Sequence, residues 1–238
     1  MDSSEEKDVI YLDYNATTNI HEEVRKVMEP YLNIYFGNSS SSHKYGIQTK
    51  KGIFNARQQI AKMLNCSSNE IIITSGASES NNLVIKGIAE YRKNLGNKII
   101  ISVLEHSSIV APCNYLASLG YDVSIISLTE DGTINLDELK EELDDNTILV
   151  SIAAVDSELG TIQPINEIAK IVKEYKNCCF HTDATQAIGK VDIDYSNVDF
   201  ITFAPHKFYG LNGSGVLINR NNIKLTPLIH GGKSTTIY

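Results

Sequence analysis

The chain of 238 residues is 42% hydrophobic and 21% charged, a globular composition that excludes disordered, collagen-like and disulfide-stapled classes. Its 29 acidic against 21 basic residues give a net charge of −8, which disfavours nonspecific binding to a nucleic-acid backbone. The start MDSSEEKD lacks the basic and apolar regions of a signal peptide, and the apolar run around 148–155 is too short to span a membrane. We therefore expect a cytoplasmic protein with neither nucleic acid nor membrane as a partner.

Helical and strand periodicities alternate along the chain after an extended segment, YLDYNATT. Apolar residues at helical spacing predict helices over 21–32, 46–64, 78–94, 107–119 and 164–175. Short β-branched runs predict strands over 71–74, 98–102, 122–127, 147–152, 179–182, 199–203 and 215–218. Asn135, followed three residues later by Glu138, predicts a capping box at the start of one more helix.

This alternation predicts an α/β fold with a mostly parallel sheet flanked by helices, because near-continuous apolar strands need cover on both faces. No Pro/Gly-rich linker divides the chain, so we expect one domain over 1–238 that includes the extended segment of about 1–20. Functional residues are expected in the loops after the strands, at their carboxyl ends.

The four cysteines lie at 66, 113, 178 and 179, with no CxxC pair and no His spacing typical of zinc. The sequence therefore predicts neither a disulfide framework nor a metal site. Cys178 and Cys179 are neighbours in a strand-like run, where successive side chains point to opposite faces, so we interpret both as buried structural residues. A reactive thiol is the alternative.

The loop Thr74–Ser80 follows an Ile-rich run and opens a helix. Its small and hydroxyl residues present free backbone N–H groups and the positive end of a helix dipole to an anion, with the Ser78 hydroxyl beside them. Such a loop is typical of a phosphate site. A serine N-cap without a ligand is the structural alternative.

Polar and ionisable side chains follow three further strands. Asp183 and Gln186 come after an apolar strand, where an unpaired polar group is costly. Lys207, beside His206, either extends its amine to solvent or keeps a lowered pKa as a nucleophile. His106 is either a structural histidine or a group that stacks on a ring and moves protons.

Together these loops match the needs of pyridoxal phosphate. This cofactor requires an anion-binding loop for its phosphate, a carboxylate for its pyridinium nitrogen and a lysine for its Schiff base. The sequence supplies each of the three after a strand, so we expect them to meet at one edge of the sheet.

The segments YLDYNATT, FGNSSSSHKYG, TSGASESNNLVIKG, EHSSIV, HTDATQAIGK and FAPHKFYG, in this order and spacing, resemble the cysteine desulfurases of the NifS/IscS type. These belong to the class V aminotransferases, which have the type I fold of pyridoxal phosphate enzymes. The resemblance covers essentially the whole chain and implies the large cofactor-binding domain. It also implies a homodimer, L-cysteine or selenocysteine as substrate, a sulfur-acceptor protein, and a role in sulfur metabolism and iron–sulfur cluster assembly.

The resemblance assigns three catalytic residues: Lys207 as the Schiff-base lysine, Asp183 at the ring nitrogen and His106 stacked on the ring. Ser157 stands where the family usually has Asn, and Ala204 where it commonly has Ser. The cofactor-binding positions implied by the resemblance are Ala77, Ser78, His106, Ser157, Asp183, Gln186, Ala204, His206 and Lys207.

Three features of the family have no counterpart in this sequence. These are the nucleophilic cysteine, the small C-terminal domain and the Arg-Ser-Gly-Thr motif that follows the HGG segment in the family. This chain has HGGKSTTIY where that motif is expected. We therefore expect a chain truncated before the nucleophilic cysteine and inactive by itself, with a natural short protein as the alternative.

Two other function classes are the alternatives to a desulfurase. A noncatalytic homologue would keep the fold and act as a cofactor-binding or dimerisation scaffold. A nucleotide-binding Rossmann protein is disfavoured, because no G-x-G-x-x-G follows the first strand.

Overall fold

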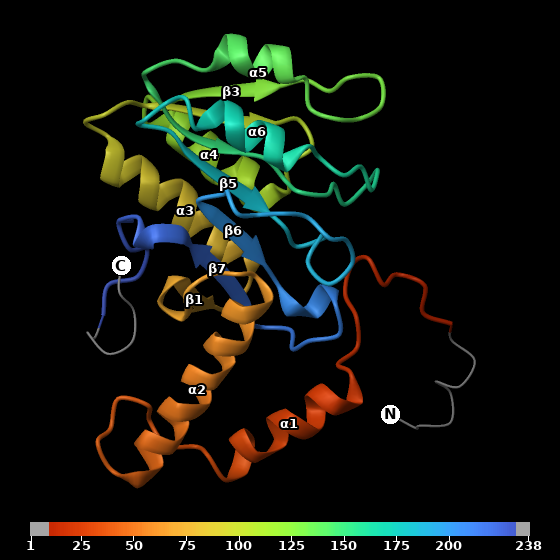
Figure 1. Ribbon diagram of the computed structural model, residues 1–238, viewed down its shortest axis with the longest axis vertical. Helices are drawn as coiled ribbons and strands as arrows, with labels where there is room; N and C mark the ends of the chain where they lie inside the picture. Colours follow the sequence, from red (N-terminus) through yellow and green to blue (C-terminus); the bar gives the residue numbers. More distant parts are fainter. Residues whose placement is uncertain (1–9, 232–238) are drawn as a thin grey trace.

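The computed structural model describes residues 10–231, and the expectations for residues 1–9 and 232–238 lie outside them. The strands form one seven-stranded sheet in the order β1-β7-β6-β5-β4-β2-β3 (Figure 1). Their bounds are β1 (Ile71–Thr74), β2 (Lys98–Ser102), β3 (Asp122–Ile126), β4 (Thr147–Ser151), β5 (Cys179–Asp183), β6 (Phe200–Phe203) and β7 (Gly215–Asn219). All seven predicted strands are confirmed within one or two residues.

The sheet is mostly parallel, as predicted. Strands β3, β2, β4, β5 and β6 pair in parallel, whereas β7 pairs antiparallel with both β6 and β1. Because two antiparallel steps separate β1 from β6, these two strands point the same way. The carboxyl ends of β1, β2, β4, β5 and β6 therefore meet at one edge, and β7 begins there.

Helices cover both faces of the sheet. α3 (Ala77–Arg92) and α4 (Ser107–Ser118) pack on one face, and α5 (Leu136–Glu142) and α6 (Ile165–Val172) on the other (Figure 1). α1 (Glu22–Asn33) and α2 (Lys44–Met63) extend away from the sheet. Three short 3-10 turns complete the described chain: η2 (Ser68–Glu70), η3 (Pro205–Lys207) and η4 (Arg220–Asn222).

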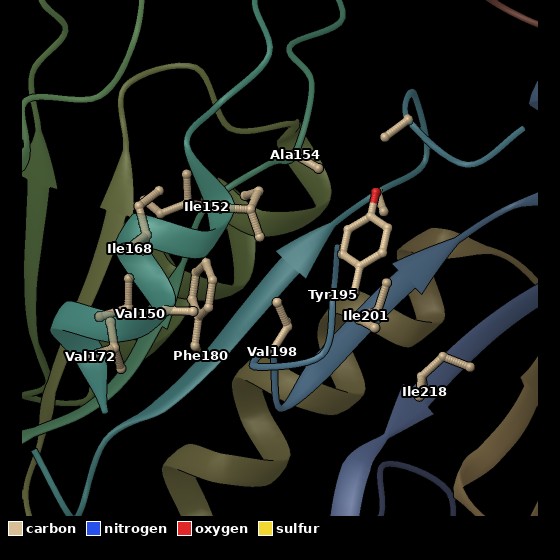
Figure 2. Close-up of a cluster of buried hydrophobic side chains, with 14 of the residues drawn as sticks. Val150, Ile152, Ala154, Ile168, Val172, Phe180, Tyr195, Val198, Ile201 and Ile218 are labelled. Atoms are coloured by element: carbon tan, nitrogen blue, oxygen red, sulfur yellow. The ribbon is translucent and has the colours of Figure 1, made fainter. Parts of the chain in front are cut away.

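Two apolar cores, one on each face, fix this arrangement. On one face, Phe180 of β5 lies among Val150 of β4 and Ile168 and Val172 of α6 (Figure 2). Burying each such side chain stabilises the fold by about 1.5–3 kcal/mol. The interior strand β4 is buried at every position, which explains its near-continuous apolar sequence.

The adjacent cysteines lie in different cores, as predicted. Cys178 packs with the α6 face and Cys179 with the α3 face. Burial raises the pKa of Cys179 to about 12 and also raises the pKa of Cys178. Both thiols therefore stay protonated at neutral pH, in line with a structural role.

The predicted capping box at α5 is half right. Asn135 caps the helix, because its Oδ1 accepts from the N–H groups of Asp137 and Glu138. The Glu138 carboxylate does not return to the cap; it accepts instead from the N–H and hydroxyl of Ser127. The reciprocal bond is lost because Ser127, just after β3, supplies two donors to the same carboxylate.

Within the part of the chain that the structure describes, we find no helix with the length and apolar character of a membrane span.

Candidate functional site

One cavity of about 660 Å³ lies at the common edge where the parallel strands end. The loops after β1, β2, β4, β5 and β6 line it, together with the extended segment before α1. Eight of the nine predicted cofactor-binding residues line this cavity: Ala77, Ser78, His106, Ser157, Asp183, Gln186, His206 and Lys207. Ala204 does not; its side chain is 1% exposed and packs in the core just before η3.

The loop between β1 and α3, which the sequence predicts to bind an anion, lines the cavity. Gly76 is the N-cap of α3 and provides no side-chain cap, so the alternative of a serine N-cap is wrong. The N–H groups of Ala77 and Ser78 have no acceptor within residues 10–231. A Cβ on Gly215 would lie 2.4 Å from the Gly76 carbonyl carbon, so glycine there lets the start of β7 support the loop.

Asp183, the last residue of β5, presents a buried carboxylate to the cavity. Its Oδ1 accepts from the N–H of Thr185 at 2.9 Å, and its Oδ2 accepts from Asn81 Nδ2 at 2.8 Å. No basic side chain among the described residues forms an ion pair with it. Such a carboxylate is suited to hold a protonated nitrogen of a bound group.

Lys207 ends the 3-10 turn η3 and points its amine into the cavity. Nζ donates to the carbonyl oxygens of Asn15 at 3.0 Å and Ala16 at 2.9 Å. Partial burial lowers the pKa of Lys207, against the opposing effect of the Asp183 and Asp13 carboxylates. The amine is therefore held inside the site, which favours the nucleophile over a lysine extended to solvent.

The extended segment before α1 is the part of the site that sequence reasoning did not assign. The Asn15 side chain donates to the Ser157 backbone carbonyl at 2.8 Å, and the Asn15 backbone carbonyl accepts from Gln186 Nε2 at 3.2 Å. Thr17 Oγ1 lies 3.0 Å from Nδ1 of His206, whose pKa is lowered by burial and by the charge of Lys207. The only sequence signal was the run of polar and small residues in YLDYNATT.

His106 is the N-cap of α4 and also lies at the cavity. Its Nδ1 accepts from the N–H of Ser108 at 3.1 Å, which caps α4, and lies 2.8 Å from the Ser108 hydroxyl. The ring also lines the cavity. The capping bonds occupy Nδ1, so Nε2 remains for a bound group.

Glu105, one residue earlier, is a buried carboxyl beneath the cavity. Its Oε1 accepts from the Ser102 hydroxyl at 2.7 Å and from the N–H of Ala153 at 2.8 Å. Burial and, to a smaller extent, the Asp183 charge raise its pKa to about 8, against these two hydrogen bonds. The neutral acid therefore joins the loops after β2 and β4 at neutral pH.

This burial predicts a pH-dependent stability. Because the folded pKa of Glu105 exceeds the unfolded value, its contribution is complete at acid pH and is lost between about pH 4.5 and 8. Glu105→Gln is expected to gain stability relative to the native chain across this window, on the order of 3 kcal/mol. Urea unfolding at the two ends of the window measures the difference. The exposed Glu174→Gln is the control, and an equal gain there would contradict the assignment.

No cysteine lines the cavity. Cys66 is half-buried, and Cys113, Cys178 and Cys179 are buried. Burial raises the pKa of Cys113 to about 12. Within residues 10–231 there is also no cluster of His, Cys, Asp and Glu that could hold a metal ion.

Comparison with known proteins gives one consistent family. Residues 10–238 match the family described as Aminotransferase class-V. The chain is 45% identical to the cysteine desulfurase IscS of Dictyoglomus turgidum and 46% identical to that of Buchnera aphidicola subsp. Baizongia pistaciae. Each alignment covers 94% of this chain and 57% of the relative, so the chain spans little more than half the length of these proteins.

Solved structures agree with this similarity. A NifS-like protein superposes with a TM-score of 0.90 at 36% identity, covering 94% of this chain and 62% of that one. A structure described as SspA in complex with cysteine superposes with a TM-score of 0.89 at 38% identity, covering 94% of this chain and 65% of that one. The similarity thus extends over the sheet and all the loops that line the cavity.

Proposed function

Because the chain belongs to the class V aminotransferases, a family that depends on pyridoxal phosphate, we propose that its cavity binds this cofactor and serves a cysteine desulfurase. The observation that carries the proposal is the meeting of Lys207, Asp183 and the open first turn of α3 in one cavity. We further propose that the chain forms the large cofactor-binding domain of such an enzyme.

The residues fit the cofactor at each of its groups. The free N–H groups of Ala77 and Ser78 suit the phosphate, and His206 lines the cavity with them. The Asp183 carboxylate suits the pyridinium nitrogen. Thr185 lines the same cavity, and its hydroxyl is buried without a partner among the described residues. An unpartnered polar atom at this place favours a ligand that completes it.

Two departures from the family weaken the fit without removing it. Ser157 has a shorter side chain than the usual Asn, and its backbone carbonyl accepts a hydrogen bond from the Asn15 side chain. Ala204 is buried and brings no hydroxyl to the cavity. Each missing neutral hydrogen bond is worth about 0.5–1.5 kcal/mol of affinity.

Pyridoxal phosphate, when bound, supplies an aldehyde that condenses with amines and a ring that withdraws electrons from the attached group. Lys207 offers its amine to that aldehyde, and its lowered pKa keeps more of the amine neutral. The Nζ of Lys207, inside the same cavity, would move a proton to or from the substrate Cα. The carboxylate of Asp183 would hold the proton on the ring nitrogen, and His106, which lines the same cavity, would contact the ring.

The substrate we propose is L-cysteine, with selenocysteine as the alternative. A protein thiolate attacks the substrate sulfur, the carbon–sulfur bond breaks, and the products are alanine and a protein persulfide. None of the four cysteines of this chain lines the cavity, and burial raises the pKa of each. The thiol that accepts sulfur is therefore not among them, and the chain alone is expected to bind cofactor without turnover.

A homodimer is also proposed, supported by the apolar surface of the first two helices. α1 has no buried residue and exposes Val27 and Leu32, and Phe54 of α2 is 54% exposed. An uncovered apolar surface of this kind marks an interface. Sedimentation equilibrium is expected to give a dimer, and Val27→Asp with Leu32→Asp is expected to shift it to the monomer. An unchanged dimer in this variant would place the interface elsewhere.

The test of cofactor binding is direct. The purified chain is incubated with pyridoxal phosphate, reduced with borohydride and digested, and the pyridoxyl group is located by peptide mass. We expect a single adduct, on Lys207. An adduct scattered over surface lysines would contradict the proposal.

A further inference from the structure

Behind the cavity, a buried amide joins two of the groups that line it. Asn81 of α3 is completely buried and does not line the cavity. Its Nδ2 lies 2.8 Å from Oδ2 of Asp183 and 2.9 Å from Oγ of Ser108. Ser108 Oγ in turn lies 2.8 Å from Nδ1 of His106. A chain of three hydrogen bonds therefore runs from Asp183 to His106.

The direction of these bonds follows from their chemistry. A carboxylate can only accept, so the Asn81 atom that faces Asp183 is the nitrogen. Its second hydrogen is donated to Ser108 Oγ. The hydroxyl hydrogen of Ser108 is then free for Nδ1 of His106, which also accepts from the Ser108 N–H. The neutral imidazole consequently carries its proton on Nε2.

The amide is also incompletely satisfied. Oδ1 of Asn81 is buried and has no partner among the described residues. An orphaned buried acceptor costs stability, and an apolar residue of similar size would avoid this cost. The amide at position 81 therefore supplies two hydrogen-bond donors at a cost in folding stability.

We propose that Asn81 is a positioning residue that holds the Asp183 carboxylate and, through Ser108, fixes the ring and tautomer of His106. Its role in cofactor binding rests on the proposed function. The two groups that flank the ring are thereby oriented by one side chain that touches neither cofactor nor substrate. Loss of the amide affects both groups at once.

The first test needs no cofactor. In the ¹⁵N spectrum of His106 at about pH 8.5, Nδ1 is expected at the position of an unprotonated nitrogen. Asn81→Leu is expected to move both ring resonances toward a mixture of tautomers, although residue 81 does not contact the ring. Ser108→Ala is expected to do the same, and Ser108→Thr, which keeps the hydroxyl, to restore the native positions. Unmoved resonances in Asn81→Leu would overturn the proposal.

The second test is a double-mutant cycle on cofactor affinity, measured by absorbance titration. Asn81→Leu is expected to weaken binding about tenfold and Ser108→Ala about threefold, with the double variant no weaker than about tenfold, because the substitutions break one chain. Ser107→Ala, on the exposed neighbour in the same turn, is the matched control. Additive losses of affinity would contradict a single hydrogen-bond chain through Asn81 and Ser108.

Two readouts keep the outcomes distinct. Circular dichroism confirms that Asn81→Leu is folded, and if it is not, Ser108→Ala and Ser108→Thr decide the question at a half-buried position. If the native chain binds no pyridoxal phosphate, the proposed function fails, while the His106 resonances still test the hydrogen-bond chain. If the cofactor binds and the His106 resonances do not move in Asn81→Leu, only the proposed role of Asn81 fails.

Discussion

Lys207→Ala is expected to abolish the borohydride-stable adduct with pyridoxal phosphate and to weaken retention of the cofactor by about a hundredfold or more. Lys207 lines the cavity and directs Nζ into it, where it donates to the carbonyls of Asn15 and Ala16. Partial burial lowers its pKa, so it supplies a neutral amine more readily than a surface lysine does. Peptide mapping after reduction measures the adduct, and gel filtration measures retention.

Two variants separate the effect of the Lys207 amine from the effect of its positive charge and from that of a neighbouring lysine. Lys207→Arg keeps the positive charge but lacks an amine that condenses with an aldehyde, so it is expected to behave as the alanine variant does. Lys190→Ala removes a lysine whose pKa is also lowered but which does not line the cavity, and it is expected to keep the adduct. A native adduct in Lys207→Ala would assign the covalent role to another residue.

Sequence patterns sufficed for the interior strands because burial on both faces forces continuous apolar runs, and the partly exposed edge strands β1 and β3 still carry short β-branched runs. The run Thr147–Ser151 is buried throughout and was recognised for that reason. The antiparallel direction of β7 was not predicted, since its pairing with β1 joins segments far apart in the chain. The capping partner of Glu138 was missed for the same reason, because Ser127 reaches it only through the fold.

The candidate site was predictable where its polar residues directly follow an apolar strand. Asp183, Lys207 and the loop before α3 stand directly after apolar runs, and the cavity brings them together. Asn15 lies in a segment without periodicity, so only the tertiary structure places its carbonyl on Lys207. Asn81 was missed because a polar residue within a helix pattern does not indicate by itself that it is buried against a carboxylate.

Asp183→Asn is expected to weaken pyridoxal phosphate binding by about ten- to a hundredfold while the adduct, when it forms, stays on Lys207. The substitution removes the buried charge that we propose for the ring nitrogen. It also replaces an acceptor facing Asn81 Nδ2, so one of the two amides must reorient. Because the Asp183 charge raises the pKa of Lys207, its loss lowers that pKa further and keeps the amine available.

The matched control is Asp199→Asn, because Asp199 is also shielded but lies at the opposite end of the sheet. Its Oδ2 accepts from the N–H of Phe180 at 2.8 Å, and burial raises its pKa. Loss of this carboxylate is expected to leave cofactor affinity unchanged, which separates the cavity from a general effect of removing a shielded charge. If Asp183→Asn bound the cofactor as tightly as the native chain, the carboxylate would not hold the ring nitrogen. Lys207 and the first turn of α3 would then account for binding without it.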